Sequence, residues 1–338
     1  YLLIFWSSVV VIRGFTTSIQ DWVTNFGNVY MGLAWFTPCV LLLGNKIKLW
    51  NIVFKALLFM FVLMIIAFLI EPYVGRVKTE WTWLLRPINF VLIIGLYKKS
   101  IINKLMMIVI MIIYIVIAIK VKQRVEFIFL FMVLVFSLID KLKHIKIKRY
   151  LLKYILFGFI LFLLIVFTYG YENVSHAIEL IIEFQDSRTF LFQELLLDLN
   201  PWEKVFGRGS LGTYYSDFFE RTRKYYEITG RTAWAGDVPD RITTEVGYLQ
   251  MILKGGFLLF GFTAFFMFYS AFLGIFRSNN KFCKNLGFYI LILSILSLIS
   301  FRPAFTPIFI ILWLSIGTVL NKKNRSLSNE EIYKLFKI

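Results

Sequence analysis

The sequence predicts an all-α polytopic integral membrane protein with about ten visible membrane-spanning helices and one large outer loop of mixed helix and coil. Three observations lead to this fold class. Hydrophobic residues make up 59% of the 338 residues, and the mean hydropathy of +0.74 exceeds what a water-soluble core needs. Apolar runs of about spanning length recur along the chain. The cationic residues separate into two sets of connecting segments.

The predicted spans follow one another almost to the C-terminus. An apolar helix needs roughly 20 residues to cross a bilayer, and short polar connectors divide the runs. Residues 1–12 are predicted to be the exit end of a span, and the others are 29–43, 52–70, 88–97, 105–119, 127–139, 151–169, 246–276, 287–301 and 304–320. Because the chain begins with Tyr1 rather than methionine, we expect an N-terminal piece with one or two further spans to precede it.

The distribution of Lys and Arg predicts the orientation, because these residues accumulate in short loops on the cytoplasmic side. One set of connectors holds 18 Lys/Arg, and the short connectors of the other set hold eight. The first set, predicted inside, comprises 44–51, 98–104, 140–150, 277–286 and 321–338; the second, predicted outside, comprises 13–28, 71–87, 120–126 and 301–305. The chain then divides into an N-terminal transmembrane bundle (1–169), an outer loop (170–245), C-terminal transmembrane helices (246–320) and a cytoplasmic tail (321–338).

Several function classes conflict with this composition. The formal net charge of +17 comes mostly from the flanks of spans, and the segment 170–245 carries eight Lys/Arg against 13 Asp/Glu, so nucleic acid is not an expected partner. The two cysteines, Cys39 and Cys283, fall in a span and in a cytoplasmic connector, where no outer disulfide framework forms. With two histidines and no CxxC or HExxH pattern, we expect no metal site and no cofactor.

Arginine is concentrated on the predicted outer side. Of the 18 cytoplasmic cations three are arginine, whereas 11 of the 16 outer cations are. The guanidinium group matches phosphate oxygens two at a time and stays charged at physiological pH, which suits a phosphorylated substrate on that side. The alternative is that positive-inside selection uses lysine, and that the outer arginines pair with the 13 acids of the loop.

The outer loop contains predicted local structure. Asp186 and Ser187 precede the run 188–199, which reads as a capped amphipathic helix at the membrane surface, ended by Asn200-Pro201, with Arg188 in its first turn. Three glycines follow within 205–219. They predict a tight turn, either an ordinary glycine turn or one whose backbone amides hold an anion beside Arg208.

The stretch TTEVGYLQMILKGG (243–256) places an acid, Glu245, at the outer mouth of an apolar run. One interpretation is an acid in the first turn of a helix capped by Thr243 or Thr244, favourable by roughly 0.3–1 kcal/mol. The other is a positioned general base, which typically contributes about 10²–10⁴-fold to a rate. Both roles are compatible with each other.

These residues resemble the O-antigen polymerase and O-antigen ligase superfamily of bacterial envelope enzymes. That family typically shows an arginine that opens a loop helix, a Phe/Leu-Gly-x-Gly turn, and a His-x10-Gly segment that begins the next span. The matching positions here are Arg188, Phe206-Gly207-Arg208-Gly209 and Glu245-x10-Gly256, with Tyr248-Leu249 as the aromatic-leucine pair. The resemblance covers about 188–262 at the level of motifs, and elsewhere only the architecture agrees, which is similar to the GT-C type of glycosyltransferase fold.

The resemblance implies a polysaccharide polymerase in the bacterial inner membrane, with its active site facing the periplasm. Its donor would be an oligosaccharide linked through pyrophosphate to undecaprenol, its acceptor a glycan, and a chain-length regulator or another assembly protein would be a partner. Glu245 stands where the ligases carry histidine, and Phe192 where their Arg-x3-Leu pattern has leucine, which favours a polymerase over a ligase. A ligase that transfers glycan to a lipid A-core or another acceptor is the alternative, and a lipid-linked oligosaccharide flippase is the alternative of another class.

The candidate site residues are a base and a set of arginines. Glu245 is the candidate base for the acceptor hydroxyl. No Asp-x-Asp occurs in the outer segments to hold a divalent cation, so arginines would have to neutralise the departing pyrophosphate. The candidates for this role are Arg188, Arg241, Arg302, Arg208 and Arg86.

Overall fold

The computed structural model describes residues 1–16, 18–74, 90–91, 109, 111–116, 132, 187–217, 219–220, 240–298 and 300–336. The predicted span 151–169 and most of 88–97, 105–119 and 127–139 lie outside these residues. In the described part, α13 (Gly247–Phe276) is long and apolar enough to cross a membrane. The bent pair Ile19–Gly27 and Gly32–Asn45 makes a second candidate if it is one span. About ten spans therefore remains a prediction.

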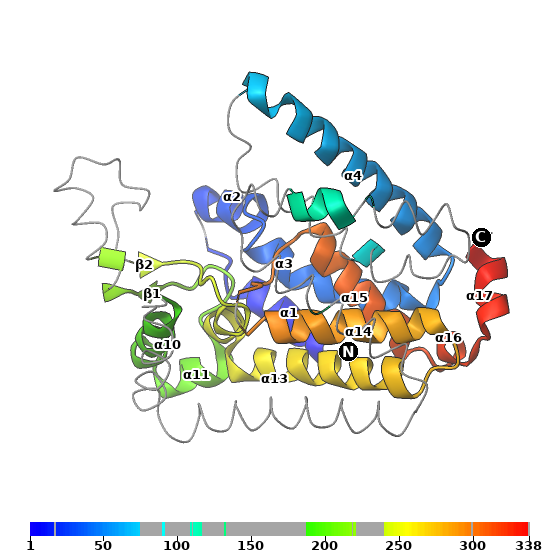
Figure 1. The fold of residues 1–338 in the computed structure, drawn as a ribbon. Helices are drawn as coiled ribbons and strands as arrows, with labels where there is room; N and C mark the ends of the chain where they lie inside the picture. The colour runs from blue at the N-terminus through cyan, green and yellow to red at the C-terminus, as the bar shows by residue number, and fades with distance from the viewer. Residues whose placement is uncertain are drawn as a thin grey trace, which may run out of the picture.

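Helices make up nearly all of the described secondary structure. The elements are α1 (Leu2–Ile12), α2 (Ile19–Gly27), α3 (Gly32–Phe36), the 3-10 helix η1 (Thr37–Asn45), α4 (Leu49–Val74), α10 (Ser187–Asp198), α11 (Pro201–Phe206), β1 (Tyr214–Tyr215), β2 (Asp240–Arg241), α13 (Gly247–Phe276), α14 (Lys281–Leu296), α15 (Pro307–Leu320), α16 (Lys322–Ser326) and α17 (Asn329–Phe336). Helices α13 and α14 run side by side, with α10, α11 and the β pair at one end and α16 and α17 at the other (Figure 1).

Close approach between helices builds the core. An added Cβ on Gly274 of α13 would lie 2.7 Å from the Cα of Gly287 in α14, and one on Gly44 of η1 would lie 2.1 Å from the carbonyl carbon of Gly317 in α15. Small residues at such crossings let backbones pack against one another inside a membrane, where no hydrophobic effect drives helices together. An aromatic group around Trp50, whose ring stacks on Phe90 at 5.1 Å, fills the space beside α14.

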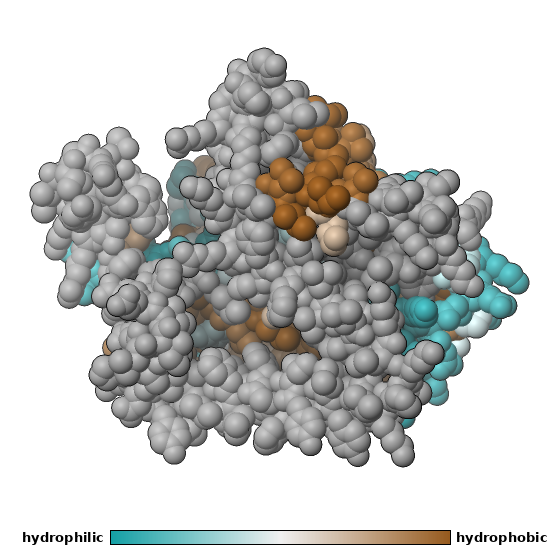
Figure 2. Space-filling view, viewed as in Figure 1, coloured by the Kyte–Doolittle hydropathy of each residue, from teal (hydrophilic) through white to brown (hydrophobic). Residues whose placement is uncertain are grey.

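Three of the predicted cytoplasmic connectors meet at the α16 and α17 end. The side-chain amide of Asn280 donates to the Asn324 carbonyl at 2.9 Å, and that of Asn324 donates to the Gly44 carbonyl at 2.9 Å. The Asn51 amide reaches the Leu335 carbonyl at 3.3 Å. Nine Lys/Arg and two Glu lie in the described parts of these connectors, and hydrophilic atoms gather over α16 and α17 at the right of Figure 2.

Predicted outer segments meet at the opposite end. The amide of Phe305 donates to the Val29 carbonyl at 2.6 Å, and Ser210 Oγ donates to Asn25 Oδ1 at 2.8 Å. Between the two ends α4 presents apolar side chains, with Ile52 and Phe59 more than half exposed. A hydrophobic patch lies in the same part of the molecule in Figure 2. The sidedness of the two ends stays a prediction.

Helix α13 is interrupted at Gly256, and the carbonyls that this break frees bind the glycine-rich part of the loop. Gly256 has φ +70°, so the backbone leaves the helical region there. The carbonyls just before it, which a continuous helix would use internally, accept hydrogen bonds from elsewhere. Leu253 O accepts from the Arg208 amide at 2.8 Å, Lys254 O accepts from the Gly209 amide at 2.9 Å, and Gly255 O accepts from Trp6 Nε1 at 2.9 Å.

Candidate functional site

Glu245 lies just before α13. The helix begins at Gly247 with Val246 as its N-cap residue, and no acid lies in its first turn. The expectation that Glu245 occupies the first turn after a threonine cap is therefore wrong. Gly247 is closely packed at this start, since an added Cβ there would lie 2.4 Å from the Phe301 carbonyl oxygen. A helix-capping role no longer accounts for this acid.

An arginine holds the Glu245 carboxylate from one side. Arg241 Nη2 lies 3.7 Å from Glu245 Oε1, and the side chains are 10% and 50% exposed, respectively. The guanidinium carbon of Arg241 also lies 5.1 Å from the centroid of the Phe219 ring. The Phe219 ring and strand β2 therefore hold Arg241 in place, whereas the Glu245 side chain is half exposed and accessible to a ligand.

Arg302 approaches the same segment from the connector between α14 and α15. Its guanidinium carbon lies 3.6 Å above the centroid of the Tyr30 ring, and its Nη1 lies 3.3 Å from Thr243 Oγ1. The other N–H groups of Arg302 have no hydrogen-bond partner in the part of the chain that the structure describes. Arg302 therefore combines a fixed ring plane with unused donors, which is what binding of an oxyanion requires.

Arg208 has a structural environment. Its guanidinium donates to Asp198 Oδ2 at 2.5 Å, to Glu203 Oε2 at 3.0 Å, and to the carbonyls of Asp198 and Thr213 at 2.8 and 2.7 Å. Because these contacts occupy most of its donors, the geometry favours a role in joining the end of α10 to the glycine turn. Its prediction as a pyrophosphate ligand gains no support from this position.

The glycine turn packs closely against the backbone of α13 and α1, and it does not form an anion site. The amides of Arg208, Gly209 and Ser210 donate to carbonyls of α13 and α1, so they do not point toward a ligand. Gly207 has φ +69°, and a Cβ there would lie 2.4 Å from backbone atoms of Lys254 and Gly255. Of the two interpretations of this turn, the structure supports the one without a bound anion.

Replacement of Arg208 should reduce stability. The hydrogen bond from Arg208 is the main cause that lowers the pKa of Glu203 below its ordinary value of 4.5, although burial opposes the shift. A carboxyl with a lowered pKa stabilises the fold above pH 4.5, and that stabilisation is lost as pH falls through the lowered value. We expect Arg208→Ala to cost about 1–3 kcal/mol at neutral pH and less in acid. Thermal unfolding in detergent at several pH values measures this; a constant difference at every pH contradicts the ion pair.

The remaining candidate arginines are less completely described. Arg188 is the second residue of α10, which confirms its predicted place in the first turn, and its side chain lies outside the described residues. Arg86 lies outside them entirely. The helix end at Asn200 is confirmed, since Asn200 and Glu203 form a reciprocal capping box at the start of α11.

One apolar stripe of α10 packs against protein, while Leu197 of the same helix is exposed; the predicted position of α10 at the membrane surface stays a prediction. Leu191, Leu195 and Leu199 are at most 2% exposed and pack in one cluster with Tyr214 and Leu249. The stripe therefore fixes α10 against the start of α13. It also brings Glu194, on the same helix, to the β pair, where Ser216 Oγ donates to its carboxylate at 2.6 Å.

Glu194, Tyr214 and Ser216 were missed as members of this site. Burial is the main cause that raises the pKa of Tyr214, with Arg241 opposing and with Glu194 and Glu245 adding to the shift, so the phenol remains protonated. No local pattern identifies these residues, since their neighbourhood depends on pairing between β1 and β2 and on the packing of α10 against β1. Only the aromatic content of 205–219 marks the segment in the sequence.

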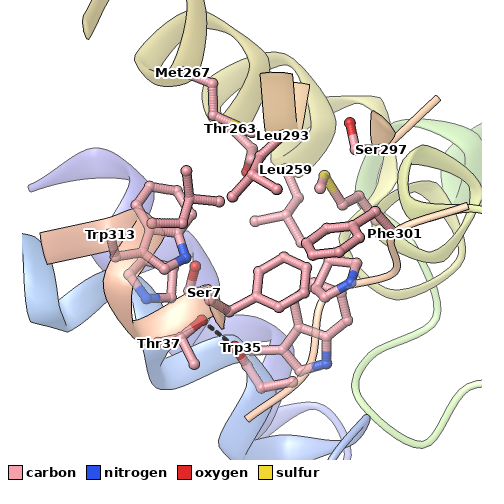
Figure 3. Close-up of a pocket in the computed structure, with 16 residues that line it drawn as sticks. Ser7, Trp35, Thr37, Leu259, Thr263, Met267, Leu293, Ser297, Phe301 and Trp313 are labelled. Carbon is pink, nitrogen blue, oxygen red and sulfur yellow. Dashed lines mark hydrogen bonds between the residues drawn. The ribbon is translucent and has the colours of Figure 1, made fainter. Parts of the chain in front are cut away.

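The cavity in Figure 3 is separate from these side chains. It lies among α1, α3, α13, α14 and α15, with a volume of about 20 Å³, which is room for about one water molecule. Trp313 and Phe301 lie on opposite sides of it (Figure 3). The buried polar atoms Ser7 Oγ and Trp35 Nε1 line it without hydrogen-bond partners in the described part. This space is too small for a sugar or a lipid chain.

Comparison of the chain with protein-family models, curated proteins and solved structures finds no match. In the described part of the chain, no three His, Cys, Asp or Glu residues come together as a metal site would require.

Proposed function

We propose that the chain is a polysaccharide polymerase of the bacterial inner membrane. It would be an inverting, metal-independent glycosyltransferase that joins undecaprenyl-pyrophosphate-linked oligosaccharide repeats at the periplasmic face. The observation that carries the proposal is one half-exposed carboxylate, Glu245, at the predicted outer end of α13: Arg241 lies 3.7 Å from it, and a second arginine, Arg302, contacts Thr243, two residues earlier.

The proposed reaction is a single displacement. The acceptor hydroxyl oxygen attacks the anomeric carbon of the donor sugar and forms the new glycosidic bond, while the bond from that carbon to the pyrophosphate oxygen breaks. Glu245 takes the hydroxyl proton, and the electron pair of the broken bond leaves with the undecaprenyl pyrophosphate. Attack from the face opposite the leaving group inverts the anomeric configuration. Positioned cations stabilise the charge that develops on the pyrophosphate.

Arg302 suits the pyrophosphate better than Arg208 does, and Arg241 stays a candidate beside its partner Glu245. Arg208 is enclosed by Asp198 and Glu203, whereas Arg302 has no carboxylate partner among the described residues. Arg188 and Arg86 stay in the proposal on the strength of the resemblance alone. Glu245 and Arg241 would also have different tasks: the carboxylate accepts a proton, whereas the guanidinium remains charged.

Arg302→Ala should reduce turnover by about tenfold, and Arg302→Lys should restore only part of the loss. An ammonium group lacks the planar fork that binds two oxygens at once and that stacks on the Tyr30 ring. The measurement is polymer formation by purified protein at matched concentrations, with Lys281→Ala at the other end of the molecule as the control. Equal rates for wild type and Arg302→Ala would remove Arg302 from the pyrophosphate site.

The gel profile of surface polysaccharide from a deletion strain tests the reaction class. A polymerase mutant should still cap its lipid anchor with a single repeat. A ligase mutant should accumulate undecaprenyl-linked polymer and attach none, and a flippase mutant should retain the lipid-linked unit inside. Chains of normal length and abundance in the deletion strain would reject all of these functions.

One observation bears on the flippase alternative. Transport sites inside a membrane typically contain paired ionisable residues. Lys254 is the buried cation of α13, and its ammonium donates to the Gly212 carbonyl at 2.7 Å rather than to an acid in the described part. This environment suits a contact that ties the loop to the helix, so we keep the enzyme as the proposal.

A further inference from the structure

The two-stranded sheet gathers polar side chains on one face. Tyr214 lies opposite Arg241 in the antiparallel register, and directly opposite residues project to the same face. Tyr215 is exposed while Tyr214 and Ser216 are buried, so Ser216 continues on the face of Tyr214. Because Ser216 Oγ donates to Glu194 at 2.6 Å, the α10 carboxylate joins this group.

The Tyr214 hydroxyl has an unusual environment within the group. The residue is 0% exposed, and its hydroxyl makes no hydrogen bond of good geometry in the described part of the chain. Burial raises its pKa, and the Arg241 side chain, which lies beside it, opposes that rise. Buried polar groups are almost always paired, so an unpaired one calls for an explanation such as a ligand that completes the site. The charges of Arg241, Glu194 and Glu245 all act on this phenol, which places the hydroxyl among the candidate site residues.

Arg302 and Glu194 have different neighbours at this end, while Arg241 lies on the face of Tyr214 and Ser216. Arg302 has no carboxylate partner among the described residues, whereas Glu194 lies with Ser216 and Tyr214. A carboxylate repels a pyrophosphate but accepts hydrogen bonds from neutral hydroxyl groups. The Glu194 side therefore suits a hydroxyl-rich ligand, and the Arg302 side suits an oxyanion.

We propose that Glu194 is the residue that binds the hydroxyl groups of the acceptor sugar, with Ser216 holding its carboxylate and Tyr214 acting as a positioning residue beneath it. This inference rests on the proposed function, since it assigns the second substrate of the same site. Glu194 accepts hydrogen bonds from the sugar, and the Tyr214 hydroxyl gains a partner when the carboxylate is drawn toward the ligand. Glu245 remains the base for the attacking hydroxyl.

The test separates the acceptor from the donor. The full chain in detergent receives the undecaprenyl-pyrophosphate oligosaccharide as donor, and the same repeat released from its lipid by mild acid as a soluble acceptor. Glu194→Gln should raise the KM for the soluble acceptor by about tenfold, because a charged acceptor of hydrogen bonds is replaced by a neutral one. Cleavage of the donor by water should fall by a smaller factor. Asp240→Asn, on the neighbouring strand, is the control and should leave both unchanged.

Tyr214→Phe tests the positioning role independently. Its hydroxyl makes no hydrogen bond in the described part, so its removal should leave the thermal unfolding temperature unchanged or raise it. The acceptor KM should nevertheless rise by about threefold or more. Tyr215→Phe, which removes an exposed hydroxyl bonded to Glu220, should not alter that KM. A change in stability without a change in KM would overturn the positioning role.

The outcomes distinguish this inference from the proposed function. If wild type cleaves no donor, the polymerase proposal fails, and saturation-transfer NMR with the soluble repeat then decides whether Glu194 holds sugar. Weaker binding in Glu194→Gln supports the inference; equal binding overturns it. If wild type polymerises and Glu194→Gln keeps the acceptor KM, the inference fails alone. Should Glu194→Gln not fold, Ser216→Ala, which releases the carboxylate, replaces it with the same expected rise in KM.

Discussion

Glu245→Gln should lower the rate of polymer formation by at least about a hundredfold while the protein still binds the donor lipid. Glutamine keeps the size of the side chain and can still contact Arg241, but it cannot accept a proton at neutral pH. Because Glu245 lies outside α13, the substitution removes no helix cap and should change stability little. The measurement is turnover with purified undecaprenyl-pyrophosphate-linked substrate, with thermal unfolding recorded beside it.

Two further variants sharpen this result. Glu245→His restores the residue type that the ligases of the resembling family carry, and retained activity with a pH profile displaced upward would favour the base assignment. Glu203→Gln is the control, since that acid belongs to the capping box of α11 and not to the candidate site. Near-wild-type turnover in Glu245→Gln would assign the carboxylate to holding Arg241 and would remove it from the chemistry.

Gly256→Ala should destabilise the protein by at least about 3 kcal/mol. Its φ of +70° with ψ of −175° is a region that essentially only glycine adopts, and a Cβ would lie 2.0 Å from the Val205 carbonyl oxygen. To avoid this clash, the backbone at Val205 must move, and the Arg208 and Gly209 amides that donate to α13 carbonyls move with it. Activity should fall together with stability, because the start of α13 carries the candidate site.

Gly261→Ala is the matched control on the same helix. Nothing lies within 4 Å of an added Cβ at Gly261, and this residue sits inside the helical part of α13. Alanine in place of glycine within a helix should stabilise by roughly 0.5–1 kcal/mol. The two alanine variants should therefore shift the thermal unfolding temperature in opposite directions. A similar small shift for both would mean that the break at Gly256 is not required by the fold.

The sequence by itself determined features whose signals are local. Hydrophobicity along the chain marks α13 as a helix of spanning length, and the helix predicted over 188–199, found at Ser187–Asp198, follows from apolar spacing and an Asn-Pro pair. The cytoplasmic side that Lys and Arg assign to 44–51, 277–286 and 321–338 stays a prediction, and the structure shows that these three segments meet around Asn280 and Asn324. The helix signals, by contrast, are local. Such features depend on residues within one or two turns of each other.

The tertiary structure alone decided how the candidate site is assembled. Helix α13 begins at Gly247, which packs closely against the Phe301 carbonyl, and Glu245 lies outside the helix without a threonine cap between them. The carbonyls freed by the break at Gly256 accept hydrogen bonds from the backbone amides of the glycine turn, so these amides are not available to an anion. Four hydrogen bonds occupy the Arg208 side chain. Pairing of β1 with β2 places Tyr214 opposite Arg241, and the hydrogen bond from Ser216 adds Glu194 of α10. Each of these outcomes depends on hydrogen bonds and contacts between segments distant in sequence, and no local pattern of residues specifies such partners.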